Sequence, residues 1–103
     1  MIQGTTPTLR FNLPFGTSSI EKAEIVVEYV DANKKTQIVK ESADCKFGSD
    51  YIEAKLTQEE TLSIPAPATV CVQLRVLTKD GTALATVVKC VSVKRLLKGA
   101  VIK

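Results

Sequence analysis

The sequence predicts an all-β protein: an immunoglobulin-like antiparallel β-sandwich of about seven strands with at most one short helical turn. Apolar and polar residues alternate with a period of two through most of the chain, which is the pattern of half-buried strands. Turn-forming residues recur at intervals of roughly a dozen residues, a spacing typical of sandwiches. The length of 103 residues is also that of one ordinary domain, so residues 1–103 are expected to form a single unit.

Strand patterns in the first half of the chain are separated by turn sequences. Residues 8–13 alternate between two prolines, which keep this strand short because proline cannot donate to a central ladder. Residues 22–30 and 35–41 flank Asp-Ala-Asn-Lys, which favours a turn because Asp and Asn tolerate left-handed backbone. Residues 44–47 and 51–56 flank Gly-Ser-Asp and are predicted to form a hairpin.

The middle of the chain has room for one turn of helix. Residues 57–60 (TQEE) have the spacing of a capping box, in which the Thr57 hydroxyl accepts a bond from the third amide and Glu60 reaches back. Prolines at 65 and 67 prevent a longer helix. The helical turn is therefore expected at about residues 58–62.

The last third of the chain carries the strongest strand pattern. Residues 69–78 and 83–94 alternate on either side of Asp80-Gly81, the dipeptide that best indicates a hairpin. Lys89 interrupts the apolar series of the second segment, so this strand is expected to bend, bulge or change face there.

The three cysteines are Cys45, Cys71 and Cys90. Their odd number and the absence of a C-x-x-C pair fit neither a complete disulfide framework nor a zinc site. Cys71 and Cys90 lie in strongly apolar segments, so we expect buried free thiols that pack as small hydrophobes. Free thiols in turn imply synthesis in a reducing compartment.

No enzymatic chemistry is predicted. The chain has no histidine, which removes the commonest general base and metal ligand and excludes Ser-His-Asp and Cys-His arrangements. Its glycines are isolated, so no phosphate-binding loop is present. The adjacent carboxylates Glu59 and Glu60 belong to the capping turn. We therefore predict no catalytic residues, no cofactor and no metal.

The charge pattern does not indicate nucleic acid or membrane as a partner. The net charge is +3 and the lysines are interspersed with acids, without the clustered stripe that nucleic-acid binding requires. One local basic cluster lies in the C-terminal segment, at Lys94, Arg95, Lys98 and Lys103. No apolar run approaches the length of a membrane span, and the N-terminus lacks the pattern of a signal peptide.

Three segments carry a resemblance to a known group of proteins: residues 4–13 (GTTPTLRFNL), 56–61 (LTQEET) and 72–81 (VQLRVLTKDG). In this order they resemble small structural proteins encoded in tail-gene regions of bacteriophages and prophages of Gram-positive bacteria. They are also similar to the N-terminal β-sandwich of phage baseplate upper proteins. The resemblance spans residues 4–93. It implies a structural protein of the virion tail, made in the cytoplasm of the bacterial host and without catalytic residues.

The resemblance implies assembly with further copies of the chain, as a homo-oligomer, and with other phage tail proteins. Residues 1–6 and 95–103 are the candidate docking arms, because the sandwich is expected to close with the strand that ends near Val93. The candidate assembly contacts are Leu96, Leu97, Val101 and Ile102. These residues are expected to pack on a neighbouring subunit, or else to fold back as an edge strand of their own domain.

The alternative function is a carbohydrate- or surface-binding adhesion module. Such modules display exposed aromatic side chains, whereas this chain has two tyrosines, Tyr29 and Tyr51, and no tryptophan. The scarcity of aromatic residues therefore favours the structural tail protein.

Overall fold

The computed structural model describes residues 1–102, which contain eight strands, one α-helix and two 3₁₀ turns. The strands are β1 (Thr8–Asn12), β2 (Ile20–Asp31), β3 (Lys34–Glu41), β4 (Lys46–Phe47), β5 (Tyr51–Lys55), β6 (Ala68–Thr78), β7 (Ala83–Ala85) and β8 (Lys89–Val93). The helix α1 spans Gln58–Leu62, and the turns η1 and η2 span Thr17–Ser19 and Ser42–Asp44. The all-β prediction is confirmed, with eight strands in place of about seven.

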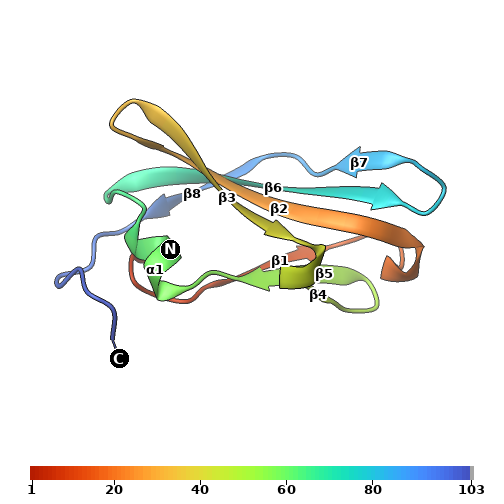
Figure 1. The fold of residues 1–103 in the computed structure, drawn as a ribbon, viewed down its shortest axis with the longest axis horizontal. Coiled ribbons are helices and arrows are strands. Elements are labelled where there is room, and N and C mark those ends of the chain that lie inside the picture. The colour runs from red at the N-terminus through yellow and green to blue at the C-terminus, as the bar shows by residue number, and fades with distance from the viewer. Residues whose placement is uncertain (103) are drawn as a thin grey trace.

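The strands form two antiparallel sheets that lie one over the other (Figure 1). The smaller sheet has the order β1-β5-β4. The larger sheet has the order β3-β2-β6, and both β7 and β8 pair with the far side of β6. These are the B-E-D and C′-C-F-G strand orders of an immunoglobulin-like sandwich.

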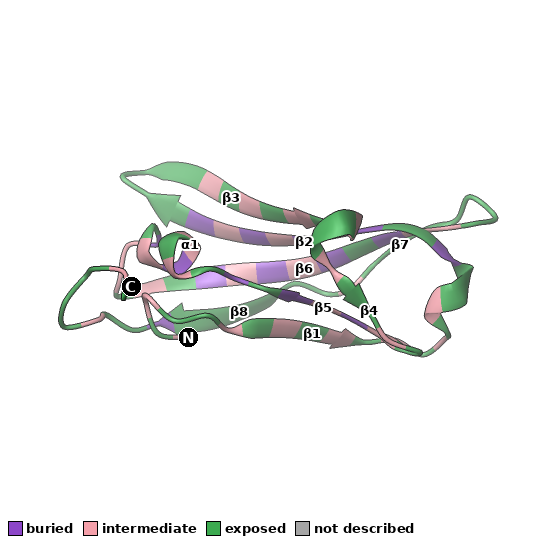
Figure 2. Cartoon of the chain, turned by 60° about the horizontal axis from the view of Figure 1, so that its bottom comes forward, coloured by how far each residue is buried: buried purple, intermediate pink, exposed green. Residues whose placement is uncertain are grey.

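The core lies between the two sheets, on the inward faces of β2, β6 and β5. Buried residues alternate with half-buried or exposed ones along these strands (Figure 2), as expected where one face of a sheet is covered and the other is partly open to water. Ile25 on β2 stands opposite Leu74 on β6, and Val27 stands opposite Val72. Burying each aliphatic side chain of this kind stabilises the fold by about 1.5–3 kcal/mol. The largest fully buried apolar side chains are those of Ile25, Ile52, Leu56, Ile64, Leu74, Val27, Val70 and Val93.

Helix α1 connects the two sheets between β5 and β6, and its capping box is confirmed. The Thr57 hydroxyl accepts from the Glu60 N–H (3.1 Å), and Glu60 Oε1 accepts from the Thr57 N–H (2.8 Å). The hydroxyl of Thr61 is fully buried and donates to the Thr5 carbonyl (2.8 Å). The helix is thereby tied to the N-terminal segment.

The strand expected at residues 44–47 is shorter than predicted. It begins at Lys46, because Ser42–Asp44 form the turn η2. A side-chain bond holds this turn, in which the Asp44 carboxylate accepts from the Glu41 N–H (3.2 Å). Backbone groups that would have extended the hairpin are used by the turn instead.

The strand expected at residues 83–94 is divided into β7 and β8. Arg75 pairs with Ala85 and Val72 pairs with Lys89, so three residues (86–88) stand against two on β6 (73–74). An extra residue of this kind is a β-bulge, and it reverses the faces of the residues that follow. The predicted interruption is confirmed, and it lies just before Lys89.

The turn between β6 and β7 places a specific demand on Gly81. The Gly81 N–H donates to the Thr78 carbonyl (3.0 Å), and the Thr78 N–H donates to the Thr82 carbonyl (2.9 Å). The φ of Gly81 is +89°. This is a turn followed by a glycine bulge, the second of the common hairpin connections.

We expect Gly81→Val to lower the free energy of unfolding by about 1 kcal/mol or more, because a β-branched residue is strained at positive φ. An added Cβ meets no atom within 4 Å, so the effect is conformational and not steric. Gly99 is equally open and does not have a positive φ, so Gly99→Val is the matched control and should leave the melting temperature unchanged. Equal melting temperatures for the two variants would contradict the assignment.

Candidate assembly surfaces

The surfaces open to a partner are the two terminal segments and the outer face and edges of the larger sheet. Among residues 1–102, no group of three or more His, Cys, Asp or Glu side chains is placed to hold a metal ion. Within the same range, no helix has the length and apolar character needed to cross a membrane.

The C-terminal segment contains the predicted assembly contacts, and the structure divides them into two kinds. Leu97 and Ile102 are exposed, at 99% and 82% of their surface, whereas Leu96 and Val101 are half-buried. Leu96 lies against Gly4, so closely that a Cβ at that glycine would meet its Cδ2 at 2.6 Å. The described part of the segment adds no strand to the sheet beyond Val93, so the alternative arrangement, an edge strand of its own domain, is not formed there. Lys103 lies outside the described residues.

Beyond Leu96, the segment contacts its own domain again at α1. Gln58 donates from Nε2 to the Ile102 carbonyl (3.2 Å) and accepts at Oε1 from the Ile102 N–H (2.8 Å). Both bonds involve the main chain of Ile102, so its side chain is left in water. The contact therefore fixes the path of the segment without burying the Ile102 side chain.

The N-terminal segment is held against β8. The terminal ammonium of Met1 donates to the Ser92 carbonyl (3.1 Å). The Gln3 N–H donates to the Lys94 carbonyl (3.0 Å), and the Lys94 N–H donates to the Met1 carbonyl (2.8 Å). Ile2 and Lys94 form an isolated parallel bridge. Both termini lie at the end of the sandwich that carries α1 (Figure 1). Residues 1–3, part of the predicted docking arm 1–6, thus have main-chain partners in their own domain.

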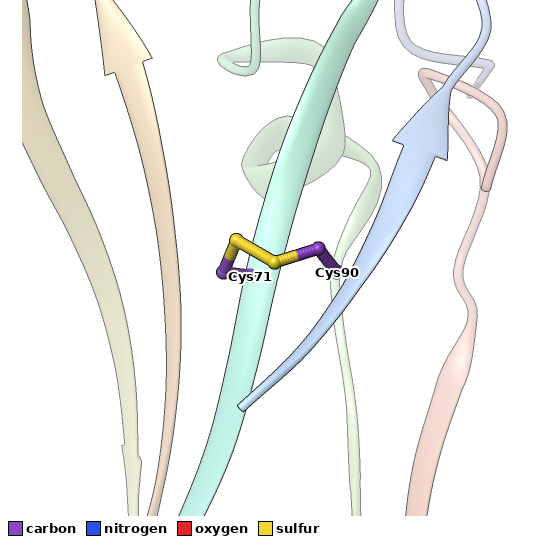
Figure 3. The surroundings of a disulfide bond; sticks show 2 residues. All are labelled: Cys71 and Cys90. Carbon is purple, nitrogen blue, oxygen red and sulfur yellow. A yellow bond between two sulfur atoms is a disulfide. The ribbon is translucent and has the colours of Figure 1, made fainter. Parts of the chain in front are cut away.

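The prediction of buried free thiols at Cys71 and Cys90 is wrong. The two residues form a disulfide between β6 and β8 (Figure 3), at a directly opposed pair of the ladder. Cys90 is exposed and Cys71 half-buried, because both side chains lie on the outer face of the larger sheet. Cys45 is the free cysteine, and burial raises the pKa of its thiol, with a smaller contribution from Asp44. The inference of a reducing compartment loses its basis in free thiols.

The outer face of the larger sheet carries apolar side chains among charged ones. Val39 and Val88 are exposed and, with Val26, line a shallow groove of about 370 Å³ that borders the disulfide. Beside it, Arg75 and Glu24 form an ion pair (3.1 Å) between opposed positions of β6 and β2. No other described element of the chain lies over this face (Figure 1).

The inner side of β3 carries an ion pair with α1. Lys40 Nζ lies 2.8 Å from Glu60 Oε1, and the Lys40 side chain is only 13% exposed. Partial burial of Glu60 acts to raise the pKa of its carboxyl, but the bonds from Lys40 and from Thr57 outweigh it, so the pKa is lowered below 4.5. The pair joins β3 to the cap of α1.

This pair is expected to make stability depend on pH in the acid range. Because the folded pKa of Glu60 is lowered, its contribution is complete above pH 4.5 and is lost as the pH falls through the folded value. Lys40→Met should cost on the order of 1 kcal/mol at pH 7, and the difference from the wild type should shrink in acid. Urea unfolding of both proteins over a pH series measures this. A difference that stays constant down to acid pH would contradict the role of the pair.

Comparison of the chain with protein-family models, with curated proteins and with solved structures gives no match.

Proposed function

We propose that this chain is a non-enzymatic structural component of a phage or prophage tail or baseplate, which assembles through protein–protein contacts with further copies of itself and with neighbouring tail proteins. The observation that carries the proposal is the C-terminal segment, whose exposed Leu97 and Ile102 gain nothing from their own domain. Covering two such side chains on a neighbour would contribute about 1.5–3 kcal/mol each. The resemblance of three segments to tail-region proteins supplies the setting.

The disulfide is consistent with this setting. Bonds of this kind persist in oxidising surroundings, which include the surfaces of virions. An exposed disulfide on the outer sheet face, such as Cys71–Cys90, suits a protein that leaves a lysed cell as part of a particle.

The distribution of aromatic side chains disfavours the adhesion module. Tyr29 is buried in the core, and the ring of Tyr51 is covered by the Arg10 guanidinium at 4.1 Å from its centroid. Phe47, at 38%, is the aromatic residue that is most exposed. A single aromatic side chain does not make the platform on which sugars stack.

The location of the chain in particles tests the proposed function. Tail particles purified from the strain that carries the gene should contain the chain, detected by mass spectrometry and by gold-labelled antibodies at the tail. If the chain is absent from intact particles and remains in the soluble fraction after induction, the proposed function is wrong.

The role of the C-terminal segment in assembly is tested by truncation after Lys94. The truncated chain should keep its melting temperature within a few degrees, because it loses the contact of the half-buried Leu96 with Gly4 but no fully buried side chain, and Leu97 and Ile102 are exposed. It should be lost from particles in a strain that expresses only the truncated form. Incorporation equal to that of the full-length chain would show that the segment is not an assembly contact.

A further inference from the structure

Strand β3 offers the longest continuous edge of the sandwich. It lies at the end of the larger sheet, has eight residues without proline, and pairs with β2 without a bulge. The other edges are shorter or broken. β1 has five residues between Pro7 and Pro14, β4 has two, and the edge of β7 and β8 is interrupted at residues 86–88. Long unpaired edges are templates for pairing with another chain.

The pairing of β3 with β2 determines which residues of β3 point their main-chain N–H and carbonyl groups away from the sheet. The Ala23 N–H donates to Ser42 Oγ (2.8 Å) and the Ala23 carbonyl accepts from the same hydroxyl (3.1 Å), so odd-numbered residues of β2 face β3. Ala32 and Asn33 both have positive φ and make the type I′ turn, with Asp31 and Lys34 opposed across it. Hydrogen-bonded pairs alternate along an antiparallel ladder, so the even-numbered residues of β3 bond β2. The outward-facing residues are Lys35, Gln37, Val39 and Glu41.

The edge is open at its centre and closed at one end. The Glu41 N–H is already bonded to the Asp44 carboxylate. Among the described residues, no side chain bonds the outward N–H or carbonyl of Gln37 or Val39. Gln37 and Val39 therefore present two N–H donors and two carbonyl acceptors to solvent. Val39 is also 42% exposed.

Charge along β3 selects the partner and its direction. Lys34 and Lys35 begin the strand, whereas Glu41 and Asp44 lie at its other end. A second copy that pairs in the antiparallel direction brings opposite charges together at both ends, and parallel pairing brings like charges together. Lys40 does not obstruct this approach, because its ammonium is turned inward onto Glu60.

One register satisfies both the main chain and the charges. With a two-fold axis at Ile38, Gln37 of each copy stands opposite Val39 of the other, and Lys35 stands opposite Glu41. Shifting the pairing by one pleat repeat in one direction places Lys34 against Lys40 of the second copy. A shift in the other direction pairs Lys34 with Asp44 but places Gln37 opposite Glu41, whose N–H is already bonded to the Asp44 carboxylate, so the main chain loses bonds at the centre of the edge.

We propose that two copies of this chain associate through antiparallel pairing of their β3 edges, centred on Ile38, so that the two larger sheets become one continuous sheet. This inference deepens the proposed function by naming a contact through which copies assemble. Addition of a strand at an exposed edge is an established mode of protein recognition, in which the main chain supplies affinity and side chains supply specificity.

A proline at the centre of the edge tests the contact. Val39→Pro removes an outward N–H that β2 does not use, and proline is tolerated on edge strands in that orientation, so the monomer should fold. Thr8→Pro on the β1 edge is the matched control, because Thr8 is exposed and even-numbered residues of β1 face away from β5. Sedimentation velocity over a concentration series should show a monomer–dimer equilibrium for the wild type. Val39→Pro should weaken it by about tenfold or more, and Thr8→Pro should leave it unchanged.

The charge pairing is tested by exchange. Lys35→Glu should weaken the dimer, and combining it with Glu41→Lys should restore it, an outcome that a merely misfolded edge cannot give. A wild-type protein that is monomeric at every concentration overturns the inference. So does a dimer that Val39→Pro and Thr8→Pro weaken equally. A dimer that is lost on truncation after Lys94 also overturns it, because the contact would then lie in the C-terminal segment. These results are independent of the particle experiment: a monomer found in tails refutes only the β3 contact, and a β3 dimer absent from tails refutes only the proposed function.

Discussion

Replacing Cys71 and Cys90 together by serine is expected to lower the free energy of unfolding by about 3 kcal/mol, because the disulfide closes a loop of 19 residues and restricts the unfolded chain. A second reason lies in β8. Four of its five residues are exposed, so the strand buries little surface of its own and its attachment to β6 depends strongly on the bond. Met1 and Gln3 in turn bond Ser92 and Lys94, so the N-terminal segment depends on β8 as well.

Urea unfolding with and without reductant measures this contribution. The wild type should lose about 3 kcal/mol on reduction, and the double serine variant should be insensitive to reductant. Cys45→Ser is the control, since that residue has no part in the bond and should leave the reductant effect intact. A thiol assay after denaturation without reductant should find one reactive cysteine per chain. Three reactive thiols would contradict the disulfide.

The alternation of residues was sufficient to predict the sandwich. Every second residue from Ala23 to Tyr29 on β2 and from Val70 to Val76 on β6 faces the core. The apolar face that these two strands share must be covered by a second layer, and here that layer is the smaller sheet. The Asp-Ala-Asn-Lys turn and the capping box of α1 were also predicted correctly. Both are local features, in which the hydrogen-bonding groups lie within four residues of one another.

The disulfide could not be predicted from an apolar neighbourhood alone. Cys71 lies on the same face of β6 as Gln73 and Arg75. These polar neighbours were the sign in the sequence that Cys71 lies on the outer face of the sheet. Reflecting β6 through the Asp80-Gly81 turn with the register of β7 places Cys71 opposite position 89. The bulge at residues 86–88 shifts the register by one and brings Cys90 opposite Cys71. Because a bulge depends on long-range packing, the pairing of Cys71 with Cys90 could not be predicted from the sequence.

The placement of the ends also lay beyond the sequence. Leu96 packs against Gly4 and Ile102 bonds Gln58, contacts across more than 40 residues for which no periodicity gives a signal. The free edge of β3 follows from the order of strands in the sheet, and an alternating pattern is the same for an edge strand and for a central one.

Leu74→Ala is expected to have the largest effect on stability among single substitutions considered, a loss of about 3–5 kcal/mol. Leu74 is 1% exposed, stands near the centre of β6 opposite Ile25, and belongs to the core between the two sheets. Removing its branched end costs the transfer energy of the lost groups and leaves a cavity that rigid strands cannot close. For a domain of about this size, such a loss lowers the melting temperature by roughly 4–8 °C per kcal/mol.

Leu84→Ala makes the same chemical change on the neighbouring strand and serves as the matched control. Leu84 is 42% exposed on β7, so water already reaches the side chain and no closed cavity forms when it is shortened. Its cost should stay below about 1 kcal/mol. Thermal unfolding of the two variants beside the wild type compares them directly. A large and equal loss for both would mean that β7 is covered in solution, whereas a small loss for Leu74→Ala would place the core elsewhere.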